Sequence, residues 1–161
     1  MERAFSAPTE AEQAHLYEVI ADLGTYPDWL ELVSSAEPTE PSAADPDELA
    51  WSITLRARIG PLARSKRLRM VRTVADGQQV RFERQELDGR QHSTWVLAAR
   101  VDPADSPWRS SVTLDLHYGG ALWSGLLDGV LQSAVDDATE RLQAYVAAPA
   151  RAGDNRPNTE T

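Results

Sequence analysis

Charged residues continue two runs of alternating apolar residues in the middle of the chain. Following Met70 by twos leads to Arg72, and following Phe82 by twos leads to Arg84 and Glu86. Residues two apart in a strand share one face of a sheet, so these three charged side chains are predicted to point toward the core. A buried charge is costly unless it finds a partner. Arg84 and Glu86 therefore either form a structural ion pair or snorkel out at the sheet edge, or the arginines anchor a carboxylate or carbonyl group of a bound molecule.

Acid–base chemistry would need a positioned acid and base inside a cavity, and Glu86 and Tyr118 are the catalytic candidates. His117 is next to Tyr118 and so lies on the opposite strand face, where Asp115 is its neighbour; this is typical of a solvent-facing pair. The sequence has no metal-ligand spacing, no nucleophile elbow, no glycine-rich phosphate loop and no cysteine. We therefore expect no metal and no cofactor.

Large apolar side chains accompany the charged ones on the same predicted faces. They either form the core or, because flat aromatic rings with polar tips suit a ring-shaped molecule, line a pocket. The predicted ligand-binding set is Trp29, Trp51, Leu55, Met70, Arg72, Phe82, Arg84, Trp95, Leu97, Tyr118, Leu126 and Val130.

Strands with a period of two are predicted to carry most of these residues. The predicted strands are 51–59, 66–74, 80–86, 93–101 and 110–118, preceded by a short strand at 2–6. Asp76-Gly77 and Asp88-Gly89 are typical of tight turns, which indicates an antiparallel meander.

Helices are predicted before and after this meander. Thr9, with Glu12 three residues later, is expected to cap a helix that Gly24 ends. A second short helix is expected at 26–33 with Pro27 in its first turn, and a solvated loop at 38–48. Apolar residues at helical spacing predict a long helix from Gly120 to about residue 146.

The order of these elements predicts an internal hollow. The long helix is the only element that could cover the apolar side of the sheet. A helix about 10 Å wide cannot cover five or six strands that lie about 4.8 Å apart. If the sheet curves around the helix, the remaining volume becomes a pocket with apolar walls.

Three segments resemble a known family. These are the run 20–29 with its Tyr26-Pro27-Asp28-Trp29 element, the strand run 80–84, and Tyr118-Gly119-Gly120 before the long helix. They are similar to the polyketide cyclase/dehydrase and lipid transport family of the START-like (SRPBCC) superfamily. The resemblance implies an α+β helix-grip fold over about residues 1–147 and a hydrophobic ligand cavity; members of the family include lipid and quinone binders and aromatase/cyclases.

Composition restricts the classes of partner. The net charge of -9 disfavours nucleic acid, no segment approaches the roughly 20 apolar residues of a membrane span, and the polar N-terminal segment does not resemble a secretory signal. We expect a cytoplasmic monomer or weak dimer with one domain at 1–148 and a disordered polar tail at 149–161. Residues 51–100 hold 11 basic and 4 acidic residues. These bases either compensate acidic helices nearby or form a basic rim or a docking face for an anionic partner.

Three functions fit these expectations. The first is binding or transport of a hydrophobic small molecule such as a lipid, an isoprenoid, a quinone or a polyketide-like compound. The second is a cyclase or dehydratase that uses the same cavity. The third is a protein-interaction module with a closed cavity, which would use the acidic first 50 residues as its contact surface.

Overall fold

The computed structural model describes residues 2–59, 61–119 and 121–147. The predicted polar tail at 149–161 lies outside these residues. The elements in chain order are β1 (Glu2–Thr9), α1 (Gln13–Ile20), the 3₁₀ helix η1 (Leu23–Asp28), β2 (Val33–Thr39), β3 (Ala50–Ile59), β4 (Leu62–Ala75), β5 (Gln79–Arg84), β6 (Trp95–Pro103), β7 (Ser110–Tyr118) and α2 (Ala121–Ala147).

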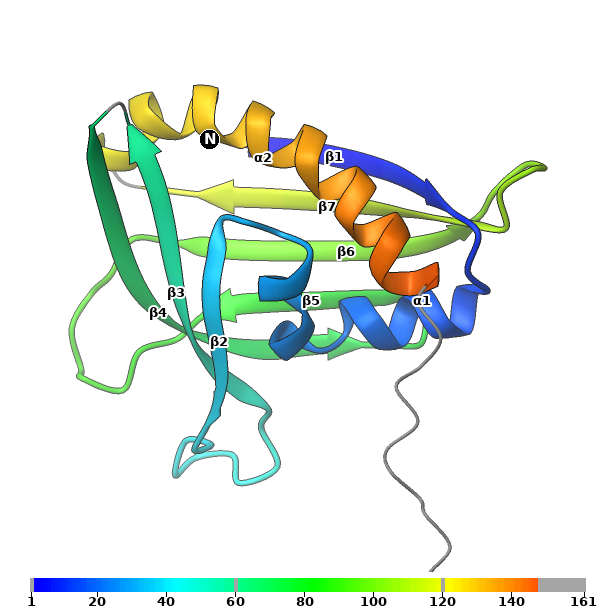
Figure 1. Cartoon of the computed structure of the whole chain (residues 1–161). Coiled ribbons are helices and arrows are strands. Elements are labelled where there is room, and N and C mark those ends of the chain that lie inside the picture. Colours follow the sequence, from blue (N-terminus) through cyan, green and yellow to red (C-terminus); the bar gives the residue numbers. More distant parts are fainter. Residues whose placement is uncertain (1, 60, 120, 148–161) are drawn as a thin grey trace, which may run out of the picture.

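The strands form one antiparallel sheet of seven strands in the order β1-β7-β6-β5-β4-β3-β2. Figure 1 shows the sheet curling around α2, which crosses from the β3–β4 hairpin to α1. The predicted α+β helix-grip fold is thus confirmed. The sheet has one strand more than the five or six that were expected.

Helix α2 contacts strands near both edges of the sheet. It packs against β1 at one side and β3 at the other, and it also contacts α1. Its buried residues Ala138, Leu142 and Val146 belong to the same core cluster as Phe5 of β1. A helix that bridges two such strands lies across the concavity of the sheet, so the middle strands curve away beneath it.

Strand β2 is absent from the sequence-based expectations. Residues 33–39 alternate poorly because β2 is an edge strand that pairs with β3 alone. Pro38 fits an edge position, where a missing N–H need not break a ladder between two strands. The expected helix at 26–33 is therefore wrong, and the loop expected at 38–48 begins two residues later than predicted, after β2 ends at Thr39.

A 3₁₀ helix takes the place of that second α-helix. The Asp22 carboxylate accepts a hydrogen bond from the N–H of Gly24 (2.8 Å) and caps η1. The buried Tyr26 hydroxyl donates to the carbonyl of Ile20 (2.9 Å), which holds η1 against the end of α1. These contacts turn the chain before Val33 enters β2.

The capping role expected of Thr9 is also wrong. Thr9 ends β1, and its hydroxyl is hydrogen-bonded to the Ser110 hydroxyl of β7 at 2.7 Å. Helix α1 begins only at Gln13, and the Glu12 side chain before it makes no capping hydrogen bond. Pairing of β1 along the whole of β7 carries Thr9 into the sheet.

Candidate functional site

A cavity opens between the edge of the sheet and helix α2. We call it the mouth pocket; it has a volume of about 590 Å³. Its described lining comes from three separate segments, Glu31–Ser34, β3 and the middle of α2, and consists of Glu31, Leu32, Ser34, Arg56, Arg58, Ser133 and Ala134. The pairing of β2 with β3 begins at Val33, which is opposite Leu55. The last residues of β3, after Leu55, therefore have no β2 residue beside them in the sheet, and β3 contacts α2.

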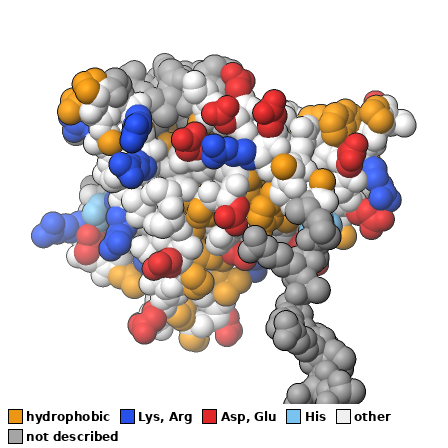
Figure 2. Space-filling model, in the orientation of Figure 1, with side chains coloured by type: hydrophobic (Ala, Val, Ile, Leu, Met, Phe, Trp, Pro, Cys, Tyr) orange, Lys and Arg blue, Asp and Glu red, His pale blue; other side chains and the backbone are white. Residues whose placement is uncertain are grey.

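Two basic side chains stand at this opening. Arg56 and Arg58 are exposed, and in the part of the chain that the structure describes neither guanidinium has an ion-pair partner. Figure 2 shows basic side chains gathered on the side of the molecule that β3 and β4 form, with acidic side chains along α2. The entrance therefore carries positive charge although the whole chain is acidic.

Several predicted pocket residues form a closed aromatic cluster instead of lining the mouth pocket. Tyr26 packs on Trp29 with ring centroids 4.5 Å apart, and Phe82 meets both Tyr26 and Trp51 edge-on. Each of these four side chains is at most 5% exposed. Burial raises the pKa of Tyr26 far above its ordinary value, so its hydroxyl stays protonated and donates. This cluster, with Met70 beside it on the inner face, fills the end of the concavity that η1 covers.

Arg72 lies at the same closed end. Its Nη1 donates to the carbonyl of Ala21 at 3.0 Å, so the guanidinium ties β4 to the residue that ends α1. The side chain is half-buried and stands opposite Phe82 across the β4–β5 pair. A backbone carbonyl at the end of a short helix is a favourable partner for a cation.

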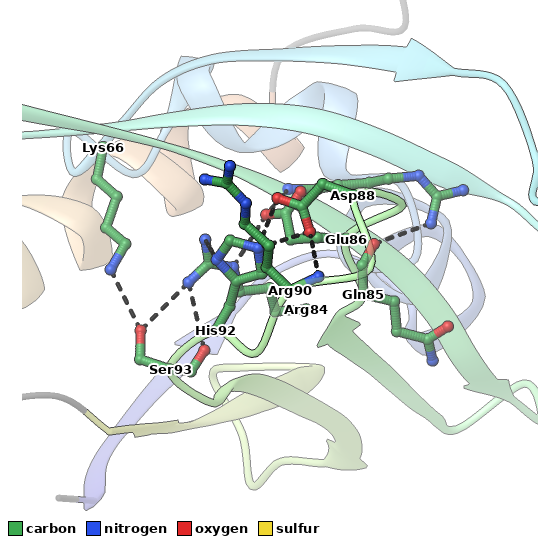
Figure 3. A network of polar contacts seen from close by, with 9 residues as sticks. Lys66, Arg84, Gln85, Glu86, Asp88, Arg90, His92 and Ser93 are labelled. Carbon is green, nitrogen blue, oxygen red and sulfur yellow. Dashed lines mark hydrogen bonds and ion pairs between the residues drawn. The ribbon is translucent and has the colours of Figure 1, made fainter.

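At the other end of the inner face lies a group that we call the inner polar cluster, made of Lys66, Arg84, Glu86 and Ser93 (Figure 3). Arg84 Nε donates to Glu86 Oε1 at 2.9 Å, so the ion pair considered from the sequence is present. Arg84 Nη1 donates to the carbonyl oxygen and to the hydroxyl oxygen of Ser93 at 3.3 and 3.2 Å. Lys66 Nζ donates to the same hydroxyl oxygen at 3.2 Å.

The inner polar cluster bridges a place where the sheet parts. Strand β5 ends at Arg84, and the chain returns to the sheet only at Trp95, so β4 and β6 have no strand between them at this level. A smaller cavity of about 180 Å³ lies here, and Arg84, Glu86, Ser93 and Trp95 are among the residues that line it.

Two stacked aromatic rings border the cluster. Trp95 and Tyr118 have ring centroids 5.3 Å apart and nearly parallel planes, and the Lys66 ammonium lies 5.7 Å from the centre of the Trp95 ring. Both rings are almost fully buried. Next to them the inner face carries Leu97 and Leu116, which are opposite one another and only half-buried.

Lys66 was not among the predicted site residues. It is opposite Leu55, which is 3% exposed on the inner face, and directly paired residues of neighbouring strands share a face. Counting backward by twos from Met70 would have found it. Burial and the neighbouring Arg84 lower the pKa of Lys66, whereas Glu86 acts in the opposite sense.

The predicted site residues thus fall into two groups. Trp29, Trp51, Met70, Arg72 and Phe82 lie together at the closed end, whereas Leu55, Arg84, Glu86, Trp95, Leu97 and Tyr118 belong to the half that lies toward the inner polar cluster. The side chains of Leu126 and Val130 lie outside the described residues. Sequence reasoning missed Arg56 and Arg58 as pocket residues because it treated them as the wet face of their strand.

The histidines of the described chain do not form a catalytic pair with the predicted candidates. The His92 ring contacts the Asp88 carboxylate through Nε2 at 2.8 Å and Arg84 through Nδ1 at 3.3 Å. His117 and Asp115 are exposed on the outer face. Among the described residues, no group of histidine, aspartate and glutamate side chains could hold a metal ion, and no helix there is long and apolar enough to cross a membrane.

Comparison with known proteins gives structural but not sequence relatives. No family model and no curated protein matches the sequence. A solved structure of a Thermus thermophilus protein is similar with a TM-score of 0.67 at 18% identity, covering 91% of this chain and 97% of that one. The Zhui aromatase/cyclase of a Streptomyces species gives a TM-score of 0.65 at 13% identity, with 96% and 98% covered. A START superfamily protein of Mycobacterium smegmatis gives 0.61 at 13% identity, with 90% and 96% covered.

At these identities the likeness concerns the fold. The chain has the START-like helix-grip fold that the sequence resemblance implied, over at least nine tenths of its length.

Proposed function

We propose that this protein binds or carries an apolar small molecule in the space between α2 and the inner face of the sheet, and that the molecule enters through the mouth pocket. The observation that carries the proposal is the cavity of about 590 Å³ between β3 and α2. Small-molecule sites in proteins have volumes of about 300–1,000 Å³. Leu32 and Ala134 supply apolar contact at the opening, and Leu97 and Leu116 expose apolar surface deeper on the inner face.

Binding accounts for the described side chains better than a cyclase or dehydratase does. The Glu86 carboxylate accepts hydrogen bonds from Arg84 Nε and from the backbone N–H of Arg69, so it is already engaged by the protein's own donors. The Tyr118 ring is 1% exposed and stacked on Trp95. A general acid must give up a proton to a substrate that it touches, and neither group is placed to do so.

Ala134 gives a direct test because it lines the mouth pocket and is 6% exposed. Ala134→Phe places a ring in the opening and is expected to weaken binding of the neutral apolar dye Nile red by at least about tenfold. Ala144→Phe is the control, since Ala144 is exposed on the same helix. Dye fluorescence measures the binding, and circular dichroism checks that both variants are folded.

The outcomes separate the candidate functions. The proposal would be supported if the wild type and Ala144→Phe bind the dye and Ala134→Phe does not. Absence of dye binding in the wild type, together with native mass spectra that show no co-purified small molecule, would refute it and favour the interaction module.

A further inference from the structure

One cation of the inner polar cluster has no carboxylate partner among the described residues. In the part of the chain that the structure describes, Lys66 forms no ion pair; its polar contact is the neutral Ser93 hydroxyl, and it lies over the Trp95 ring. Arg84 beside it differs, because Glu86 compensates its charge at 2.9 Å. The inner polar cluster therefore has two cations and one anion, and the excess charge belongs to Lys66.

The Ser93 hydroxyl can also donate a hydrogen bond, next to the Lys66 ammonium. Its oxygen accepts hydrogen bonds from Lys66 Nζ and Arg84 Nη1, both at 3.2 Å. With its oxygen used twice as acceptor, the hydroxyl can direct its hydrogen to a third group. The Lys66 ammonium keeps two further N–H bonds, and its nitrogen lies 3.2 Å from the Ser93 hydroxyl oxygen. These two donors can each bind one oxygen of the same carboxylate.

Lys66 lies one strand away from the strand that lines the mouth pocket. Lys66 on β4 pairs with Leu55 on β3, and Arg56, the next residue of β3, lines the opening. Neighbouring strands are about 4.8 Å apart, so a molecule that enters past β3 needs to cross only one strand to reach the ammonium. The Trp95 and Tyr118 rings then provide a flat apolar surface beside the bound group.

We propose that the ligand is an amphipathic carboxylic acid whose carboxylate is bound by the Lys66 ammonium and the Ser93 hydroxyl, with its apolar part in the hollow. The inference rests on the proposed function and specifies the chemistry of the ligand. The lowered pKa of Lys66 agrees with it, since burial and Arg84 disfavour the positive charge that a bound carboxylate would stabilise.

Matched acids and esters test the charge requirement. We would measure displacement of Nile red by palmitic acid and methyl palmitate, and by anthracene-2-carboxylic acid and its methyl ester. The wild type is expected to bind each acid about ten to a hundred times more tightly than its ester, the usual range for a charge-assisted hydrogen bond. Lys66→Met should remove this preference, and Lys66→Arg should retain most of it.

Arg67→Met is the control variant. Arg67 is the next residue of β4, is exposed and points to the outer face, so its loss removes the same charge without touching the inner polar cluster. It is expected to keep the acid preference of the wild type. A preference that survives in Lys66→Met, or equal affinity of the wild type for acid and ester, would overturn the carboxylate inference and leave the proposed function standing. Binding of none of the four probes would overturn both.

A pH series gives a second readout on the wild type alone. A lysine ammonium loses its proton within the alkaline range, where a guanidinium keeps its charge. Burial and the neighbouring Arg84 lower the pKa of Lys66, so its ammonium is lost at a lower pH than that of an ordinary lysine. The acid preference should fall over this range in the wild type and persist in Lys66→Arg; a wild-type preference that does not change with pH would contradict the inference.

Discussion

Two cations that lie side by side on the inner face have different surroundings. Arg84 donates hydrogen bonds to Glu86, Ser93 and His92, whereas the contacts of Lys66 with other described residues are to the Ser93 hydroxyl and the Trp95 ring. A guanidinium whose donors are spent on neighbours acts as part of the framework. An ammonium with unused donors is available to a ligand. The anchor role that the sequence indicated for Arg84 is thus assigned more readily to Lys66.

A substitution of Glu86 distinguishes the structural role of Arg84 from the ligand-binding role of Lys66. Glu86 Oε1 accepts from Arg84 Nε at 2.9 Å and from the N–H of Arg69 at 3.1 Å. Glu86→Gln keeps an acceptor oxygen but removes the charge, so we expect the free energy of unfolding in urea to fall by about 1–2 kcal/mol. Palmitate affinity should be unchanged or higher, because Arg84 would no longer be compensated.

Glu83→Gln is the matched control for this change, since Glu83 pairs with Arg81 at 3.5 Å at a more exposed position. It is expected to change stability by less than about 0.5 kcal/mol. A tenfold loss of palmitate affinity in Glu86→Gln would instead place Glu86 in the ligand site.

At the scale of elements, one buried ion pair fastens two loops to the outer face of β4. Arg69 is 8% exposed and donates to the Glu48 carboxylate at 2.8 Å, and to the carbonyls of Glu40 and Gln85 at 3.0 Å each. Glu48 also accepts from the N–H of Ser42 at 2.7 Å. Both the β2–β3 loop and the β5–β6 loop are therefore held by one side chain. The β5–β6 loop is the segment that carries Ser93 to the inner polar cluster.

The ion pair between Arg69 and Glu48 predicts that the stability of the protein falls at acidic pH. The hydrogen bonds from Arg69 and Ser42 hold the pKa of Glu48 below its ordinary value. A carboxyl with a lowered folded-state pKa adds stability above its unfolded pKa, and this stability is lost as the pH falls through the folded value. Glu48→Gln should therefore be about 3 kcal/mol less stable than the wild type at pH 7, with the difference shrinking toward pH 3. Urea unfolding at both pH values measures it; an equal difference at both would show that the charge of Glu48 is not the cause.

The elements also show where sequence reasoning succeeds and where it does not. The strands β3 to β7 and helix α2 were predictable because burial imposes a period on their apolar residues, such as Trp51 to Ala57. Strand β2 and η1 were not, because pairing at one edge and the Tyr26 and Asp22 contacts decide their form. Arg69 is on a face that alternation assigns to solvent, and only a loop distant in sequence buries it.

For the whole molecule, the position of the mouth pocket depends on the path of helix α2 across the sheet. Its last turns are held by the buried Leu142 and Val146 and by Gln143, whose side-chain amide donates to the carbonyl of Pro8 at 2.8 Å. From there the helix crosses to β3, and the mouth pocket lies along that crossing, at Ser133 and Ala134 (Figure 1). A site assembled from segments about 20 to 100 residues apart cannot be found from local sequence patterns alone.

This arrangement predicts a specific footprint in amide hydrogen exchange. A bound molecule that enters between β3 and α2 should slow exchange in three separate segments, 31–34, 56–58 and 133–134, because it stabilises the closed form of all three together. Both methyl palmitate and palmitic acid should protect these segments, and palmitic acid should protect 93–96, which carries Ser93 and Trp95, more strongly than methyl palmitate does. Strand β1 is away from the opening and serves as the internal control. Protection confined to 83–96 with both probes would mean that ligands enter through the smaller cavity at the parting of β4 and β6, and the route through the mouth pocket would then be wrong.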